Sequence, residues 1–266
     1  MPITEPDFAP SDQKMPVLFI GHGNPMNAIE DSVYSRAWIE AGQSLPRPQA
    51  ILCVSAHWET AGTKTTAMDK PRTIHDFGGF PPELYAQQYP APGSPALARL
   101  VQETIADVKI ELDTTWGLDH GAWSVLIRLY PHAEIPVVQL SLNRTQPPAY
   151  HYALGRALKP LRRRGVLIVG SGNVVHNLMV VRPGGAAYDW ALEFDETMAR
   201  LMLAGDHQAI VNYDRLGKSA RLSIPTNEHF LPLLYVLGLQ DDGEPLHFFA
   251  EGLEWGSLSM RSVRIG

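Results

Sequence analysis

Short runs of consecutive apolar residues recur along the chain, and the three clearest each end at a glycine or a serine. These runs are residues 17–20, 51–54 and 166–169. Runs this short that are apolar at every position are typical of strands buried on both faces of a parallel sheet. Four further segments are predicted to be strands, at residues 109–112, 135–142, 247–250 and 257–265.

Segments with helical spacing of apolar residues separate the predicted strands. They cover residues 28–42, 94–106, 125–129, 149–164, 188–203 and 226–238. Ser94 and Thr226 are suitable N-caps, and Gly165 follows one helix where a C-cap glycine is common. Alternating strands and helices predict an α/β fold, with a central, mostly parallel sheet flanked by helices.

The length and composition favour one domain. The 266 residues contain no linker-like stretch, so we expect residues 1–14 to form a loose tail or a packed arm and residues 15–266 to form a single catalytic domain. The net charge of −6 and the pI near 5.9 give no reason to expect a nucleic-acid partner or a membrane surface. The basic residues 162–164 are predicted to be the solvated end of a helix.

Cysteine use and hydropathy predict the compartment. Cys53 is the single cysteine and lies in a predicted buried strand, which indicates a reducing setting. The first 14 residues lack the apolar run of a signal peptide, and no segment approaches the roughly 18 apolar residues of a membrane span. We therefore expect a cytoplasmic protein, either a monomer or a small homo-oligomer.

Four of the ten histidines occupy positions that predict a shared site. His22, His57 and His176 follow the three clearest strands, and His229 falls in the predicted first turn of the last helix. Ligands of open α/β sheets collect at the carboxyl ends of parallel strands, so these side chains could meet there. Imidazole suits zinc and iron, and three imidazoles leave positions open for a substrate. We therefore predict one divalent metal ion.

Two histidines are also candidates for moving protons. His120 lies in a polar and aromatic loop, and imidazole titrates near neutral pH, so His120 and His176 could act as an acid and a base. The long loop at residues 64–92 is predicted to be a lid or a binding loop. Within it, His75 and Asp76 are weaker candidates, for which a role in loop structure is favoured. The Gly170–Asn173 turn lacks the spacing of a phosphate loop and is predicted to bring backbone close to the site.

Several ordered motifs resemble one known family. The motifs are GHGNPMN at 21–27, VSAHW at 54–58, TIHDFGGFP at 73–81, YPAPGSP at 89–95, DHGAW at 119–123, SGNVVHN at 171–177 and EHFLPLLYVLG at 228–238. Together they resemble the 4,5-DOPA extradiol dioxygenases, a branch of the class III extradiol ring-cleavage enzymes. The resemblance covers the chain from about residue 15 to its end.

The resemblance implies a function and a set of site residues. It implies a metal held by His22, His57 and His229, with His176 as a fourth ligand or as an acid–base group, and His120 as the other family histidine. The substrate would be a small catechol similar to L-DOPA, which O2 opens to a semialdehyde. The resemblance also implies zinc as the bound metal. Because zinc has no accessible redox change, we expect Fe(II) to support ring cleavage.

Two other functions remain open from the sequence. A zinc hydrolase could use the same histidines to lower the pKa of a bound water. A protein that only binds a metal or a small molecule could share the scaffold and have no activity. Dependence on oxygen separates the dioxygenase from the hydrolase.

Overall fold

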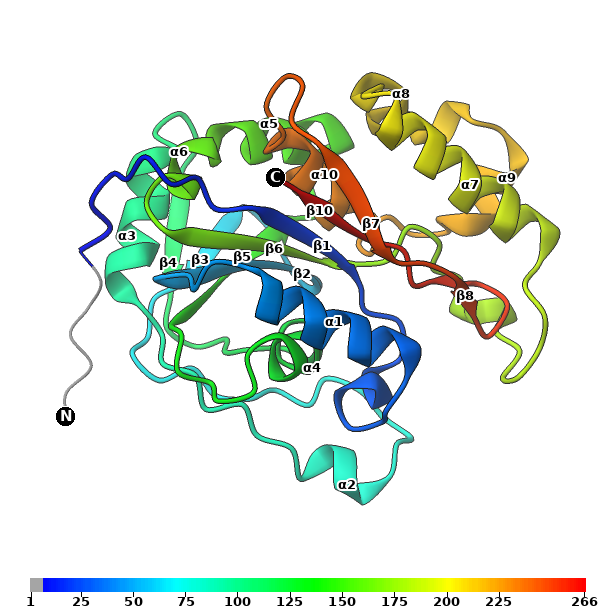
Figure 1. The fold of residues 1–266 in the computed structure, drawn as a ribbon, viewed down its shortest axis with the longest axis horizontal. Helices are drawn as coiled ribbons and strands as arrows, with labels where there is room; N and C mark the ends of the chain where they lie inside the picture. The colour runs from blue at the N-terminus through cyan, green and yellow to red at the C-terminus, as the bar shows by residue number, and fades with distance from the viewer. Residues whose placement is uncertain (1–6) are drawn as a thin grey trace.

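The computed structural model describes residues 7–266, which form an eight-stranded sheet with helices on both faces (Figure 1). Four strands run parallel at its centre, in the spatial order β5-β2-β6-β1. They are β1 (Val17–Gly21), β2 (Ala50–Thr60), β5 (Val137–Asn143) and β6 (Val166–Gly172). The predicted α/β fold with a mostly parallel sheet is confirmed.

The outer strands make the sheet mixed. β3 (Thr63–Thr66) pairs antiparallel with β5 and parallel with β4 (Ile110–Asp113). On the other edge β10 (Ser262–Ile265) lies antiparallel between β1 and β7 (Leu246–Ala250). The sequence analysis missed β3 because its threonines and lysine lack an apolar run, although β-branched threonine suits a strand.

Alternate residues of the central strands enter two separate cores. Val17 and Phe19 face one core together with helix α10 (Leu231–Gly238), whereas Leu18 and Ile20 face the other together with Trp38 and Trp123. All of these side chains are buried, which explains the unbroken apolar runs of the strands.

The helices form the outer layers on the two faces. α1 and α4 pack together on one face, and α5 and α10 pack together on the other (Figure 1). The α-helices are α1 (Val33–Ser44), α2 (Pro82–Tyr85), α3 (Pro95–Thr104), α4 (His120–Leu129), α5 (Pro148–Ala157), α6 (Lys159–Arg162), α7 (Asp189–Leu203), α8 (His207–Val211), α9 (Lys218–Ser223) and α10 (Leu231–Gly238). The remaining elements are η1 (Pro25–Ala28), η2 (Leu178–Val180), η3 (Tyr213–Arg215), β8 (Leu253–Glu254) and β9 (Leu258–Ser259).

Local bonding changes the limits of two of the predicted helices. The helix predicted at 28–42 begins only at Val33, because Ser32 and Ser35 exchange side-chain and backbone hydrogen bonds in a capping box. The helix predicted at 149–164 is divided into α5 and α6 near Pro160, which has no N–H to continue the hydrogen-bond ladder.

The segment before β1 packs on the domain where the structure describes it. Phe8 is buried, its carbonyl accepts a hydrogen bond from Arg164, and the N–H of Ser11 donates to the carbonyl of Arg163. Residues 1–6 of the predicted tail lie outside the described residues. The prediction that residues 162–164 are solvated is wrong for Arg162, which is 1% exposed and paired with Glu244.

No helix in residues 7–266 combines the length and the apolar character that crossing a membrane requires.

Candidate metal centre

His22 lies directly after β1, in a turn that its neighbours determine. Its N–H donates to the carbonyl of Gly172 at 3.0 Å, so the turn continues the pairing of β1 with β6. Gly23 then adopts a φ of +55°, and a Cβ atom there would lie 2.3 Å from Sδ of Met260. The chain therefore needs a glycine at this point, and the turn holds His22 at 3% exposure.

His57 lies within β2 and not beyond its end, which corrects the sequence prediction. β2 continues to Thr60, and its pairing with β5 shifts between Val54 and Glu59. Between the pairs Val54–Leu140 and Glu59–Leu142, β2 contains more residues than its partner. Such a bulge bends the strand and redirects its side chains, which is how a residue inside a strand reaches the site.

His120 is the first residue of α4 rather than part of a loop. The side chain of Asp119 caps the helix by accepting the N–H of Ala122 at 3.1 Å. The same buried carboxylate accepts hydrogen bonds from Ser55 on β2 at 2.6 Å and from Gln139 on β5 at 2.7 Å. These bonds tie the start of α4 to two central strands and fix His120 beside His57.

His176 lies in the segment that follows β6, and His229 lies in a second segment that is hydrogen-bonded to it. His229 precedes α10, whose first turn contains Pro232, so the prediction that it lies inside the helix is wrong. Its carbonyl accepts the N–H of Asn173 at 2.8 Å, and a Cβ on Gly172 would lie 2.1 Å from that oxygen. The predicted close approach of backbone is confirmed, but the predicted turn at Gly170–Asn173 is wrong, because Gly170–Gly172 are the last residues of β6.

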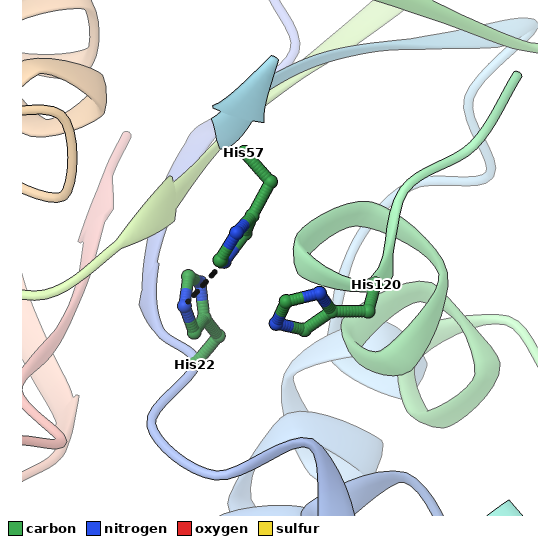
Figure 2. A group of neighbouring side chains, drawn as sticks. All are labelled: His22, His57 and His120. Atoms are coloured by element: carbon green, nitrogen blue, oxygen red, sulfur yellow. Dashed lines mark hydrogen bonds between the residues drawn. The ribbon is translucent and has the colours of Figure 1, made fainter. Parts of the chain in front are cut away.

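The structure brings all five predicted site histidines into one cluster. The Nε2 atoms of His22 and His57 are 3.4 Å apart, and His120 lies on the other side of the same space (Figure 2). The ring centroids of His22, His57 and His229 are 5.1, 5.3 and 4.9 Å apart in pairs. His120 and His176 lie closer to one partner each: the centroid of His120 is 3.8 Å from that of His57, and that of His176 is 3.4 Å from that of His229.

Two groups in this cluster could hold a metal ion. Ligand atoms of His22, His57 and His120 lie within 4.8 Å of one another, and so do those of His176, Glu228 and His229. The two groups adjoin through His229, which contacts both His22 and His57.

Burial favours the uncharged form of four clustered imidazoles, those of His22, His57, His176 and His229. Burial, together with the neighbouring imidazoles, holds the pKa values of His22 and His229 well below the usual range. Burial and the adjacent His120 lower the pKa of His57 to about 3, and burial lowers that of His176 to about 4. Neutral imidazole is the form that binds a metal, so this donor set fits a cation without first losing protons.

Each of three clustered histidines has a polar partner near Nδ1, the ring nitrogen nearer the backbone. For His22 it is Oγ of Ser171 at 2.9 Å, for His229 it is Oε1 of Glu228 at 3.1 Å, and for His57 it is Oδ2 of Asp76 at 3.6 Å. Partners of this kind leave the other ring nitrogen, Nε2, available as a ligand atom.

Sequence reasoning undervalued the partners of the histidines. It favoured a role in loop structure for Asp76, treated Ser171 only as part of a turn, and gave Glu228 no role. The adjacency of Asp76 to His75 gave no indication that it contacts two other histidines. The motif HDFGGFP was the one signal that marked its loop.

Comparison with known proteins identifies the family of the chain. The family described as the catalytic LigB subunit of aromatic ring-opening dioxygenase matches residues 19–256. The chain is 53% identical to a 4,5-DOPA dioxygenase extradiol of Escherichia coli K12 over 98% of both chains, and 37% identical to one of Beta vulgaris over 93% and 95%. It is also similar to the crystal structure of an uncharacterized Escherichia coli K12 protein, with a TM-score of 0.84 and 47% identity, covering 95% of this chain and 100% of that one.

The family match spans nearly all of the described chain and includes every clustered histidine. The resemblance inferred from the motifs is thereby confirmed. The chain belongs to the family of the catalytic LigB subunit of aromatic ring-opening dioxygenase, and it is an extradiol ring-cleavage dioxygenase.

Proposed function

We propose that this enzyme opens the ring of a small catechol similar to L-DOPA, around one divalent metal ion held by His22, His57 and His229. In the overall reaction a carbon–carbon bond beside the diol breaks, both atoms of O2 enter the product, and a semialdehyde forms. The observation that carries the ligand assignment is the near-equilateral arrangement of these three imidazole rings.

The spacing of the three rings matches what one ion requires. When imidazole nitrogens lie about 2.1 Å from an ion and meet at about 90–110°, the nitrogens are about 3.0–3.4 Å apart and the ring centroids about 4.6–5.3 Å apart. The 3.4 Å between the Nε2 atoms of His22 and His57 agrees with this range. So do the three centroid separations of 4.9 to 5.3 Å.

The other two histidines fit proton transfer better than metal binding. The centroid of His120 is 3.8 Å from that of His57 but 6.1 Å from that of His22, so the three do not form an even triangle. His176 stacks on His229 at 3.4 Å with ring planes only 6° apart, which is too close for two ligands of one ion. This supports His176 as an acid–base group rather than a fourth ligand.

The five histidines are therefore proposed to have different roles. His176 is proposed to take a phenolic proton from the catechol, and His120 to donate a proton or a hydrogen bond to oxygen during ring opening. The metal ion supplies charge that favours the catecholate and, in the case of Fe(II) but not of zinc, an accessible redox change. We propose zinc as a tightly bound occupant and Fe(II) as the working ion.

Aromatic side chains beside His120 support an aromatic substrate. Phe77, in the loop before α2, meets His120 edge to face at 5.4 Å and also contacts Phe80, Tyr85 and Trp123. A flat catechol suits a pocket with such a wall. The L-DOPA-like side chain rests on the names of the relatives. The family match favours this function over the zinc hydrolase considered from the sequence.

An oxygen-electrode assay of metal-free protein tests the proposal. The protein is loaded under anaerobic conditions with Fe(II) or with Zn(II) and then mixed with L-DOPA, dopamine and unsubstituted catechol. We expect oxygen uptake with Fe(II) only, fastest for L-DOPA, and a product whose mass equals catechol plus O2. Equal turnover with zinc would refute the metal assignment, and turnover without oxygen would refute ring cleavage.

A further inference from the structure

The carboxylate of Asp76 lies between two of the clustered imidazoles. Its Oδ2 atom is 3.1 Å from Nδ1 of His120 and 3.6 Å from Nδ1 of His57. Its Oδ1 atom accepts the backbone N–H of His120 at 2.8 Å. One side chain therefore contacts a proposed metal ligand and a proposed proton-transfer group at the same time.

The loop that carries Asp76 is fixed to α4, the helix that begins with His120. Leu118 donates its N–H to the carbonyl of Arg72 and accepts the N–H of Ile74, both at 2.8 Å. The indole of Trp123 donates to the carbonyl of Ile74 at 2.8 Å. A Cβ on Gly117 would lie 2.5 Å from the carbonyl of Arg72, so the two segments approach as closely as glycine allows.

The Nδ1 atom of His120 still needs a hydrogen-bond partner. It is buried and makes no aligned hydrogen bond to any residue between 7 and 266, although Oδ2 of Asp76 is within ion-pair distance. A small rotation of the ring toward that oxygen would satisfy it. The side chain of Asp76 is 21% exposed, so it has room for the matching movement.

We propose that Asp76 is a positioning residue that accepts the Nδ1 protons of His57 and His120 and so sets the tautomer of both rings. Both Nε2 atoms then lack a proton in the resting protein: that of His57 can bind the metal ion, and that of His120 can take up the second phenolic proton of the catechol, which it later donates to oxygen. The inference rests on the proposed role of His57 as a ligand. His22 and His229 have Ser171 and Glu228 as separate partners, whereas His57 and His120 share one.

The variant Asp76→Asn distinguishes a purely structural role of Asp76 from a positioning role. In Asp76→Asn the amide oxygen can still accept the N–H of His120, so the loop keeps that bond. The amide NH2 group would face both Nδ1 atoms as a donor, which favours the tautomer that carries its proton on Nε2. The substitution thus keeps the shape of the loop but moves the ring protons of His57 and His120 from Nδ1 to Nε2.

The test is the 15N NMR spectrum of the histidine side chains in metal-free protein, assigned with His57→Gln and His120→Gln. In the wild type we expect the Nδ1–H tautomer for both rings, and in Asp76→Asn a shift toward the Nε2–H tautomer. An Nε2–H tautomer of His57 in the wild type would overturn the proposal, and this result does not depend on whether Asp76→Asn folds.

Metal affinity gives a second measurement. Titration with Co(II) in competition with a coloured chelator should show binding about 10- to 100-fold weaker in Asp76→Asn than in the wild type. Asp69→Asn is the matched control, because it removes one charge from an exposed position in the same loop and should bind Co(II) like the wild type. Equal affinity in Asp76→Asn and the wild type would refute the inference. A wild type that binds no metal would instead refute the proposed function, and the tautomers would still test the role of Asp76.

Discussion

Two buried or partly buried clusters of ionisable side chains in this protein differ in charge state. The histidine cluster, at the carboxyl ends of the parallel strands, keeps four of its groups uncharged: the pKa values of His22 and His229 are well below the usual range, that of His57 is about 3 and that of His176 about 4. The ion-pair cluster, which consists of Lys14, Arg162, Asp241 and Glu244, keeps its groups charged.

The difference shows which cluster is suited to a ligand. In the ion-pair cluster Arg162 and Glu244 are joined at 2.5 Å, and Lys14 reaches Glu244 at 2.8 Å, so each charge is already compensated. The neutral imidazoles have lone pairs without a compensating cation. The first arrangement stabilises the fold, whereas the second favours a bound metal ion.

The largest effect should come from removing a proposed ligand. His22→Ala should lower ring-cleavage activity about 10³-fold or more, because losing the ion removes several kcal/mol of stabilisation from the transition state. Metal analysis of the purified variant should show less than one ion per chain, with the thermal midpoint of the metal-free protein close to that of the wild type. A variant that keeps both its metal and its activity would remove His22 from the ligand set.

Breaking the ion-pair cluster should affect stability and leave the metal site intact. Glu244→Gln leaves Arg162 buried without its charge partner, which costs about 3 kcal/mol. Urea unfolding measures the loss, and metal content with KM for the catechol serves as the control. If metal content fell together with stability, the two clusters would not be independent.

Removing a proposed proton-transfer group should have an intermediate effect on catalysis. His120→Ala and His176→Ala should each lower kcat about 10²-fold while the protein retains its metal. The Co(II) affinity of His176→Ala separates the two roles considered for His176. Removing a metal ligand would lower the affinity, whereas removing an acid–base group would not. A His176→Ala variant that loses its metal would show that His176 is a ligand after all.

The smallest effect should appear at acid pH. Burial alone would raise the pKa of Glu244, but hydrogen bonds from Arg162 and Lys14 lower it to about 2. Its folded pKa is therefore below the value of about 4.3 in an unfolded chain, so its stabilisation is complete above that value and is lost as the pH falls toward 2. Between pH 5 and pH 3 the wild type should lose more unfolding free energy than Glu244→Gln. Parallel losses in the two proteins would contradict this cause.

Much of the fold followed from local pattern. The apolar runs at 17–20, 51–54 and 166–169 correspond to β1, β2 and β6, because strands buried on both faces need apolar residues at every position. The β3 strand was missed because its pairing partners, rather than its composition, make it a strand. The cap at Ser32 and the proline at 160 moved helix limits by local bonding that periodicity does not reveal.

The sequence by itself determined which residues could form the site. Histidines that follow buried strands, together with the family motifs, indicate His22, His57, His120, His176 and His229. The separation of these residues along the sequence does not give the distances between their side chains in space, however. The sequence therefore cannot distinguish the evenly spaced rings of His22, His57 and His229 from His176, which stacks closely on His229.

Only the tertiary structure decided how these side chains meet. The bulge in β2 directs His57 into the cluster, the cap at Asp119 places His120 beside it, and the loop anchored at Leu118 brings Asp76 between the two. Each of these depends on contacts between segments far apart in the chain. Tautomers and pKa values follow from such contacts, because burial and neighbouring charges exist only after folding.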